Sequence, residues 1–252
     1  MHRLSIVFLV LLFLFSCNRH LVVREINTRN ITVNSQAAPV DSVLESMVKP
    51  YRDSLEKDMN TLVAISATPL VKGKPESKLT NLVADILLDF GTAYAKKQQL
   101  NMLPDASYVN YGGLRASLPQ GEITVQRIFE LMPFENELVM VELSGTDFMQ
   151  MAGKIASRGG EGVAGFRMGI RDGMAAILTV RGKVIDPQAS YWVVTSDYIA
   201  NGGDQMSMFA NARQRINTGT KIRDELIRAL TVRYRESGII DAKEDGRIYH
   251  EQ

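Results

Sequence analysis

Tyr108-Val109-Asn110-Tyr111-Gly112-Gly113-Leu114-Arg115 is the stretch of sequence that decides the fold. Its β-prone start is typical of a short strand, and two adjacent glycines follow it. Paired glycines let the backbone approach a ligand closely or adopt a positive φ. Arg115 has a planar guanidinium that can bind phosphate or carboxylate oxygens, and Asn110 can donate to the same anion or to a sugar hydroxyl. The spacing alone favours a simpler interpretation, a glycine-rich turn followed by a solvated arginine.

Helical and strand patterns interleave on both sides of this stretch. Thr124 and Ser144 are expected to cap helices, Pro50 is expected to kink or restart the first one, and the glycines between 159 and 165 indicate a flexible connection. We therefore expect a mixed fold of the α/β or α+β class. The expected helices cover 40–55, 79–94, 124–132, 144–156 and 221–235, and the expected strands 62–65, 108–111, 137–143, 166–170, 174–180, 183–185 and 191–196.

Two further segments carry aromatic side chains beside turn-forming residues. Phe134 follows Pro133 just after an expected helix end, and Tyr198 precedes the glycine turn that ends in Asp204. Two aromatics facing each other would sandwich a planar base, since stacking contributes about 1–3 kcal/mol per base. Asp204 would accept hydrogen bonds from ribose hydroxyls, as acidic residues do in dinucleotide sites. The simpler interpretations are a core phenylalanine and a turn-stabilising aspartate, and each signal alone is weak.

The distribution of histidine limits the chemistry of the chain. Histidine occurs only at positions 2, 20 and 250, and none lies within residues 21–249. A di-metal phosphatase centre typically takes several imidazole ligands from the core, and a Ser-His-Asp triad needs a histidine on the folded body. The sequence also lacks the phosphate-binding loop of the P-loop nucleoside triphosphatases and the nucleophile elbow of the α/β-hydrolases. We therefore expect no catalytic residue, no metal ligand and no cofactor on this chain.

The N-terminal segment has the pattern of an export signal. Arg3 precedes an unbroken apolar run from Ile6 to Phe15, which as a helix would rise about 15 Å, half the hydrocarbon core of a bilayer. Leu14-Phe15-Ser16-Cys17 resembles a bacterial lipobox, in which the cysteine is lipidated. We expect residues 1–17 to be a lipoprotein signal peptide and 18–40 a tether to a folded domain, which would anchor the protein at the bacterial cell envelope. An ordinary signal peptide with an incidental cysteine is the alternative.

Cysteine content and charge exclude other classes of protein. Cys17 is the only cysteine, so its use as an anchor leaves none for a disulfide, a zinc site or a nucleophile. The chain has 29 Lys+Arg and 28 Asp+Glu, and removal of residues 1–17 takes away only Arg3, which leaves 28 of each. A neutral domain without a polybasic stripe has no broad field to attract nucleic acid. We expect its partners to be small molecules or another protein.

The order and spacing of these blocks resemble the C-terminal domain of the 5′-nucleotidase family, from about Asp41 to the end of the chain. The resemblance implies a layered α/β/β/α fold, with two sheets flanked by helices, for residues 41–252. The matching blocks are Glu76-Ser77-x-x-x-Asn81-Leu82, Asn110-x-Gly112-Gly113-x-Arg115, Pro133-Phe134-x-Asn136, Asp186-Pro187, Tyr191-x-Val193-x-Thr195 and Tyr198-Ile199-Ala200-x-Gly202-Gly203-Asp204.

In that family this domain binds the nucleotide, while a separate N-terminal metallophosphatase domain holds two metal ions and cleaves the phosphate ester. The resemblance implies that Phe134 and Tyr198 clamp the base and that Asp204 holds the ribose. It also implies that Asn110 and Arg115 meet the phosphate or ribose side, with Gly113 in the same block.

Three positions depart from the family pattern. Pro75 stands where a second phosphate-binding arginine is usual, with Lys74 one residue earlier. Thr80 replaces the usual glycine before Asn81, and Gln205 replaces the glycine that often follows the G-G-D block. These departures make base and ribose recognition a firmer expectation than phosphate binding.

We expect this chain to be the nucleotide- or nucleoside-binding half of a split 5′-nucleotidase acting in nucleotide salvage. A separate metallophosphatase chain would supply divalent metal ions and the attacking water, because this chain alone is expected to be inactive. Two alternatives remain open: a nucleoside-binding lipoprotein without an enzymatic partner, and an interaction or structural lipoprotein whose pocket binds nothing.

Overall fold

The computed structural model describes residues 28, 30 and 40–251. Helices and strands interleave along the chain, as the sequence predicts. The helices are α2 (Ser42–Met59), α3 (Lys78–Lys97), α4 (Val125–Leu131), α5 (Gly145–Ser157), α6 (Asp197–Ala200) and α7 (Ile222–Ser237), with 3₁₀ turns η1 (Tyr111–Gly113), η2 (Gly203–Gln205) and η3 (Ser207–Asn211). The strands are β1 (Leu62–Ser66), β2 (Ala106–Val109), β3 (Gly121–Thr124), β4 (Glu137–Ser144), β5 (Gly162–Ala164), β6 (Phe166–Arg171), β7 (Met174–Val180), β8 (Lys183–Val184), β9 (Ser190–Ser196), β10 (Gln214–Lys221) and β11 (Ile248–His250).

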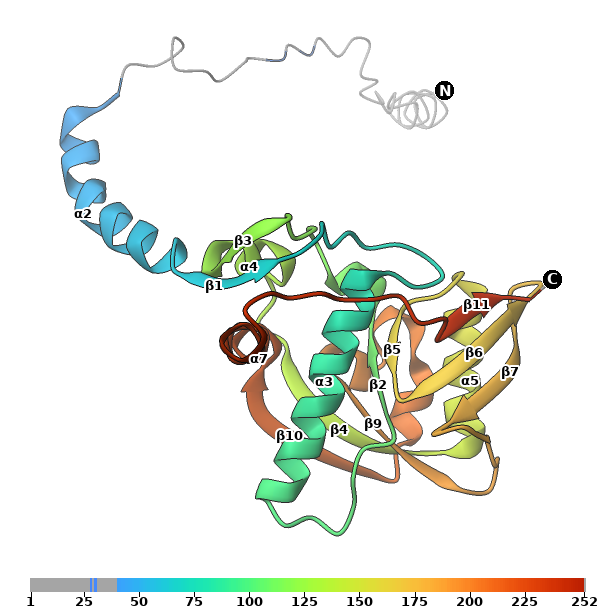
Figure 1. The fold of residues 1–252 in the computed structure, drawn as a ribbon. Coiled ribbons are helices and arrows are strands. Elements are labelled where there is room, and N and C mark those ends of the chain that lie inside the picture. The colour runs from blue at the N-terminus through green and yellow to red at the C-terminus, as the bar shows by residue number, and fades with distance from the viewer. Residues whose placement is uncertain (1–27, 29, 31–39, 252) are drawn as a thin grey trace, which may run out of the picture. The chain divides into compact units, whose positions relative to one another are not determined.

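A five-stranded sheet with the order β10-β4-β9-β2-β5 forms the centre of the fold (Figure 1). Strands β2 and β9 are parallel, and the other neighbouring strands of this sheet are antiparallel. The ends of β2 and β9 therefore point the same way, and the segments that follow them reach the same edge of the sheet. Those segments carry the G-G-x-R and G-G-D blocks.

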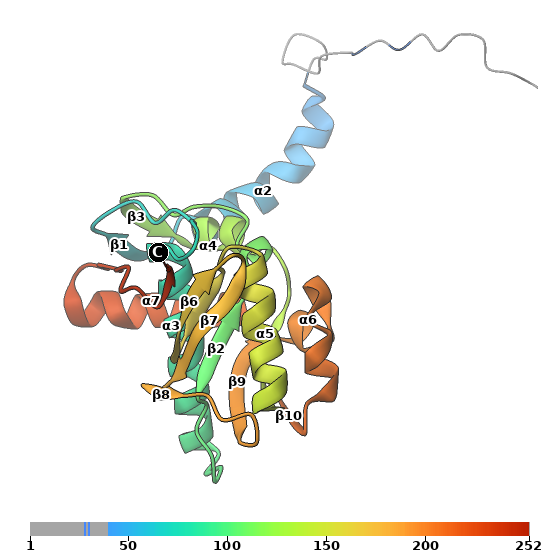
Figure 2. The ribbon, with the colours of Figure 1, turned by 90° about the vertical axis from the view of Figure 1, so that its right-hand side faces the viewer.

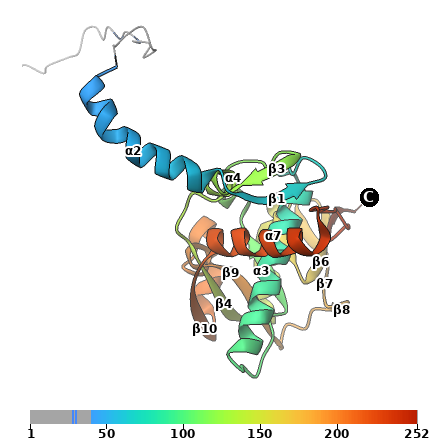
Figure 3. The same cartoon turned by 60° about the vertical axis from the view of Figure 1, so that its left-hand side comes forward.

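Two hydrophobic cores lie on the two faces of this sheet. One face, with Val109, Met140 and Val194, is covered by α3 and α7, as Figure 3 shows. The other face, with Tyr108 and Val139, packs against α5 and the strands of a second sheet (Figure 2). The alternation of side chains along each strand produces this division, because successive residues point to opposite faces. The predicted mixed α/β class is thus confirmed.

Two smaller sheets complete the fold. The second sheet has the order β11-β6-β7-β8, in which β11 runs parallel to β6. Strands β1 and β3 form a separate antiparallel pair. Strands β3, β5, β10 and β11 were not predicted from the sequence. Strand β10 lies at the edge of the central sheet and is largely exposed, so it lacks the apolar alternation that identifies a half-buried strand.

Of the two expected helix caps, Ser144 forms its capping hydrogen bond, and a further cap occurs at Ser77, which was not predicted. Ser77 and Thr80 form a reciprocal capping box at the start of α3, and the Ser144 hydroxyl accepts a hydrogen bond from the backbone N–H of Asp147 in α5. Thr124 occupies the N-cap position of α4, as expected, but its side chain makes no capping hydrogen bond.

Two other local expectations need correction. The glycine-rich segment after α5 is not merely a connection, because Gly162–Ala164 forms β5 and pairs with β2. The strand expected over 108–111 ends at Val109, and Tyr111–Gly113 forms a 3₁₀ turn. Gly162 fits here because a Cβ at that position would lie 2.4 Å from a methyl carbon of Val109.

Helix α2 spans the boundary between two compact units, residues 1–50 and 51–252. It continues as one helix through Pro50, so the expected restart does not occur. None of its residues is buried. No helix within the described part of the chain is both long and apolar enough to cross a bilayer. The expected signal peptide, Cys17 and most of the expected tether lie outside the described residues.

Candidate nucleotide-binding site

One cavity of about 650 Å³ brings together all six binding residues predicted from the sequence. It opens where the segments after β2 and β9 meet the loop between α4 and β4. Its lining consists of Asn110, Gly112, Gly113, Arg115, Phe134, Glu135, Asn136, Tyr198 and Asp204. Three segments that are far apart in sequence therefore converge on one site.

The turn after β2 supplies one wall of the cavity. Asn110 is buried, and its side-chain amide donates a hydrogen bond of 2.7 Å to the Asp204 carboxylate. Neither Gly112 nor Gly113 has a positive φ, so backbone conformation does not explain the glycine pair. A Cβ on Gly113 would lie 2.7 Å from the side-chain oxygen of Asn110. Gly113 is therefore required by the close approach of the Asn110 side chain.

The G-G-D turn supplies the opposite wall. Gly202 adopts a positive φ of 86°, and Asp204 is also left-handed, with φ 50° and ψ 36°. The Tyr198 hydroxyl donates to the Asp204 carboxylate over 2.9 Å and accepts from the Asp204 backbone N–H over 3.1 Å. The Tyr198 ring lies directly on Gly203, where a Cβ would come within 2.5 Å of a ring carbon. The turn thus fixes both the ring and the acid.

The two predicted clamp residues are both accessible from the cavity. Phe134 is 50% exposed and Tyr198 is 45% exposed, which is unusual for large aromatic side chains in a folded domain. None of the aromatic pairs in contact among the described residues joins these two rings. The two rings line the same cavity without touching each other, and base stacking between them stays a prediction.

The loop that carries Phe134 is held by two polar side chains to which sequence reasoning assigned no role. Asn136 donates to the Asp197 carboxylate over 2.9 Å. Glu135 forms ion pairs with Lys221 and Arg223, whose hydrogen bonds lower the pKa of Glu135 from 4.5 to about 2. Asn136 belongs to a recognised block, but its partner Asp197 is identified by the structure alone.

A group of cations lies on the turn beside Arg115. The Lys72 ammonium donates to the backbone oxygen of Leu114 over 2.8 Å and lies 4.3 Å from the centre of the Tyr111 ring. Burial and, after it, repulsion from Arg115 lower the pKa of Lys72. Lys74 lies 5.1 Å from the centre of the same ring. Sequence reasoning missed Lys72 because a single loop lysine carries no recognisable pattern.

The block that begins at Glu76 serves a different region of the fold. The Glu76 carboxylate accepts hydrogen bonds from the side chain of Asn81 and from the backbone N–H groups of Gly246 and Arg247. It therefore ties the C-terminal segment to the start of α3. Pro75, at the position where the family pattern has an arginine, lies against Gly160 and does not line the cavity.

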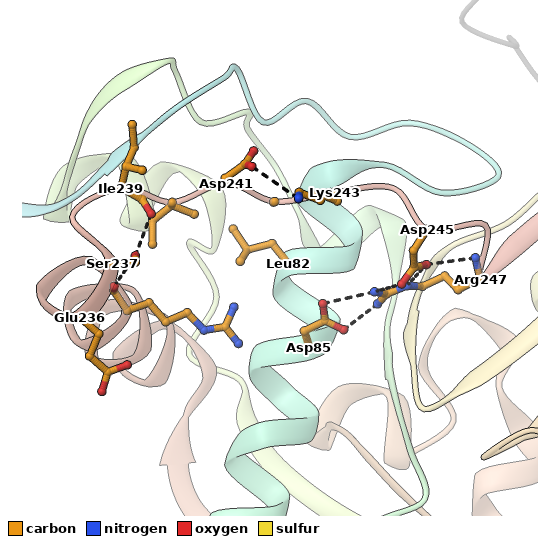
Figure 4. Close-up of a pocket in the computed structure, with 12 residues that line it drawn as sticks. Leu82, Asp85, Glu236, Ser237, Ile239, Asp241, Lys243, Asp245 and Arg247 are labelled. Carbon is orange, nitrogen blue, oxygen red and sulfur yellow. Dashed lines mark hydrogen bonds and ion pairs between the residues drawn. The ribbon is translucent and has the colours of Figure 1, made fainter.

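A second cavity, of about 680 Å³, lies along this C-terminal segment (Figure 4). Arg247 points toward Asp85 and Asp245 and forms ion pairs with both, at 2.6 and 2.9 Å. Lys243 pairs with Asp241 at 3.9 Å. Asp85, Asp241, Asp245, Lys243 and Arg247 thus pair among themselves within this cavity, and it contains none of the site residues predicted from the sequence. The first cavity is therefore the candidate functional site.

No group of three or more histidine, cysteine, aspartate or glutamate side chains in residues 40–251 is arranged to hold a metal ion. His250 lies in β11, with its side chain exposed, and the other two histidines lie outside the described residues.

The chain belongs to the 5′-nucleotidase, C-terminal domain family, whose pattern matches residues 60–211. It is 23% identical over 184 residues to a 5′-nucleotidase of Vibrio cholerae, and 29% identical over 244 residues to an apyrase of Tabanus yao. These alignments cover 71% and 86% of this chain but only 32% and 43% of the relatives. The chain thus spans less than half the length of these relatives.

Solved structures show the same fold. The 5′-nucleotidase precursor of Thermus thermophilus superposes with a TM-score of 0.69 and 27% identity, over 85% of this chain and 44% of that one. The NAD nucleotidase of Haemophilus influenzae superposes with a TM-score of 0.61 and 18% identity, over 84% and 42% of the two chains, which supports the fold alone.

Proposed function

We propose that this chain binds a nucleotide in the Phe134–Tyr198 cavity and serves as the substrate-binding part of a 5′-nucleotidase. The observation that carries the proposal is the convergence of six sequence-predicted residues on one cavity. That cavity has two half-exposed rings on its wall, and Asp204 and the ion-paired Glu135 are the carboxylates that line it. Its volume of about 650 Å³ falls within the range of small-molecule sites.

Each part of the ligand has a matching group. The base would stack between Phe134 and Tyr198, which would remove the exposed faces of both rings from water. The ribose hydroxyls would donate to Asp204, whose two oxygens retain lone pairs beyond those used by Asn110 and Tyr198. Adenosine is the simplest probe of these two contacts.

The phosphate would lie on the side of the cavity where Arg115 and Lys72 meet. Both cations are bound to backbone oxygens of the same turn, Arg115 to Gly112 and Lys72 to Leu114. Neither forms an ion pair with a carboxylate in the part of the chain that the structure describes. Arg115 lines the cavity and Lys72 lies near Arg115, and two cations without an ion pair there favour an anionic ligand, and so a nucleotide over a nucleoside.

Hydrolysis would require a metal centre from a separate metallophosphatase chain. The two chains together would form a split 5′-nucleotidase. The metal ions would polarise the phosphate and lower the pKa of the attacking water. This cavity would hold the substrate in register with that metal centre. Such positioning would be the contribution of this chain to the rate of hydrolysis. By itself the chain is expected to bind nucleotide without turning it over.

Calorimetry with adenosine and AMP tests the binding step directly. At a ligand concentration of 100 times its Kd, the folded protein should be stabilised by about 2.7 kcal/mol. Phosphate release from AMP with Mn²⁺, Co²⁺ or Zn²⁺ should require an added metallophosphatase chain. Binding without any effect of such a chain on turnover would favour the nucleoside-capturing alternative. A flat thermal response to every nucleoside and nucleotide would leave only an interaction role.

We also propose that Cys17 carries a lipid that anchors the protein at the bacterial cell envelope. The support is the lipobox-like stretch ahead of it and the absence of any other cysteine. Labelling of the expressed full chain with a radioactive fatty acid, compared with Cys17→Ser, tests this. Equal labelling of both proteins, or release of the wild-type chain into the soluble fraction, would refute the anchor.

A further inference from the structure

Arg158 lies behind the Asp204 turn and contacts it through the main chain. Its guanidinium donates a hydrogen bond to the backbone oxygen of Asp204. The Arg158 side chain is only 22% exposed, and it does not line the nucleotide cavity. It therefore contacts the acid of the site from outside the cavity.

Arg158 is itself held by a buried acid. Glu161 is 4% exposed, and one of its carboxylate oxygens pairs with Arg158 at 3.1 Å. The other oxygen accepts a hydrogen bond from the hydroxyl of the fully buried Tyr108, two residues before Asn110. The strand that leads to Asn110 is thus joined to the turn that carries Asp204 through three side chains, those of Tyr108, Glu161 and Arg158.

The Asp204 turn has a conformation that needs external support. Asp204 and Gln205 follow one another with φ of 50° and 58°, and neither is a glycine. Non-glycine residues enter this left-handed region at a cost, which surrounding contacts must offset. Arg158 supplies one such contact at Asp204, and Lys154 supplies another by donating to the Gln205 side chain over 2.8 Å.

We propose that Arg158, fixed by Glu161, is a positioning residue that holds the Asp204 carboxylate where it recognises the sugar hydroxyls of the ligand. This inference rests on the proposed function, since it assumes that Asp204 accepts those hydroxyl groups. Arg158 acts through the backbone of Asp204 and does not touch the ligand. A change at Arg158 should therefore affect ligands with sugar hydroxyls more than ligands without them.

Calorimetry with adenosine and 2′,3′-dideoxyadenosine measures this effect in the full chain. In Arg158→Met, the preference for adenosine over the dideoxy compound should fall about tenfold, while dideoxyadenosine affinity changes less than about threefold. Glu161→Gln should shift the preference in the same direction. Arg127→Met is the matched control, because Arg127 also pairs with a glutamate three residues on, at an exposed site on α4.

An equal loss of affinity for both ligands in Arg158→Met and Glu161→Gln would mean a purely structural role and would overturn the proposal, as would an unchanged preference.

A second readout needs no ligand. The Asn110 side-chain amide, bonded to Asp204, should give a protected NMR signal that loses protection in Arg158→Met but not in Arg127→Met. If the wild type binds neither nucleoside, the proposed function fails, and this signal alone decides whether Arg158 positions Asp204.

Discussion

Asn136 donates a hydrogen bond of 2.9 Å to Asp197, and this bond links the loop that carries Phe134 to the short helix α6 that carries Tyr198. Asn136 lies two residues after Phe134, and Asp197 directly precedes Tyr198. The same Asp197 oxygen also accepts from the backbone N–H groups of Glu137 and Tyr198, at 3.2 and 2.8 Å. Asp197, which lies outside the cavity, therefore connects the two segments that carry the rings.

Loss of this link should weaken ligand binding without removing either ring. Asp197→Ala leaves three donors without their acceptor, so we expect adenosine affinity to fall about tenfold and stability to fall by about 1–3 kcal/mol. Asn136→Ala removes one donor only and should have a smaller effect on both. Calorimetry and denaturant unfolding measure the two quantities, and unchanged affinity in both variants would refute the link.

Tyr198→Phe separates the stacking role of Tyr198 from its hydrogen bonds. The ring remains, but Asp204 loses a bond to its carboxylate and one from its backbone N–H. We expect affinity for adenosine to fall while affinity for dideoxyadenosine is retained. Tyr198→Ala should reduce both, by about 1–3 kcal/mol, because the stacking surface is gone. Identical profiles for the two variants would contradict this division of roles.

Lys72→Met should discriminate between nucleotide and nucleoside. Removal of one cation is expected to lower AMP affinity about tenfold and to leave adenosine affinity within about twofold. Lys78→Met serves as the control, because Lys78 is also half-buried and bonds a neutral group, the Thr68 hydroxyl, at 3.1 Å. Equal losses for AMP and adenosine would indicate that Lys72 only supports the Tyr111–Leu114 turn.

The ion pairs of Glu135 predict how the Phe134 loop responds to acid. Because the folded pKa of Glu135 is about 2, below its ordinary value of 4.5, the pairs contribute stability above pH 4.5. That contribution should decline as pH falls from 4.5 toward 2. A carboxyl NMR titration of Glu135 should give a midpoint near 2, and Lys221→Met should raise it. A midpoint of 4.5 in the wild type would show that the pairs do not form in solution.

Gly113→Ala tests the reason for the glycine pair. A new Cβ would overlap the Asn110 side chain, so we expect destabilisation of about 1–3 kcal/mol and weaker adenosine binding. Gly153→Ala is a matched control within α5, where a Cβ meets no atom within 4 Å. Since alanine favours helix over glycine, that control should be stabilised by up to about 1 kcal/mol. A neutral result at Gly113 would show that Asn110 can move aside freely.

Much of this fold could be predicted from local patterns, and the failures have physical reasons. Helix α3 and strand β4 have clear apolar periodicity because each buries one face or both. Strand β10 was missed because an exposed edge strand has no such pattern, and β5 because a three-residue strand that begins with a glycine gives too short a signal. Segments of this kind acquire their structure from the strands beside them.

The binding site, like the fold, contains residues that could be predicted from the sequence and residues that could not. Phe134, Tyr198 and Asp204 were predicted because their types and spacing carry a recognisable order. Asp197 and Arg158 were not, because their roles depend on which backbone atoms the fold places next to them. Such contacts join residues that are 46 to 61 positions apart and leave no local trace in the chain.

The left-handed conformation of Asp204 has a consequence for how this domain can evolve. Asparagine tolerates that conformation about as well as aspartate, so a substitution of Asp204 by asparagine would preserve the backbone while removing the negative charge. The backbone turn would survive that single change, whereas one of the two bonds that the carboxylate accepts, from Asn110 or from Tyr198, would be lost. The same pocket would then be free to acquire a preference for ligands that the Asp204 carboxylate repels.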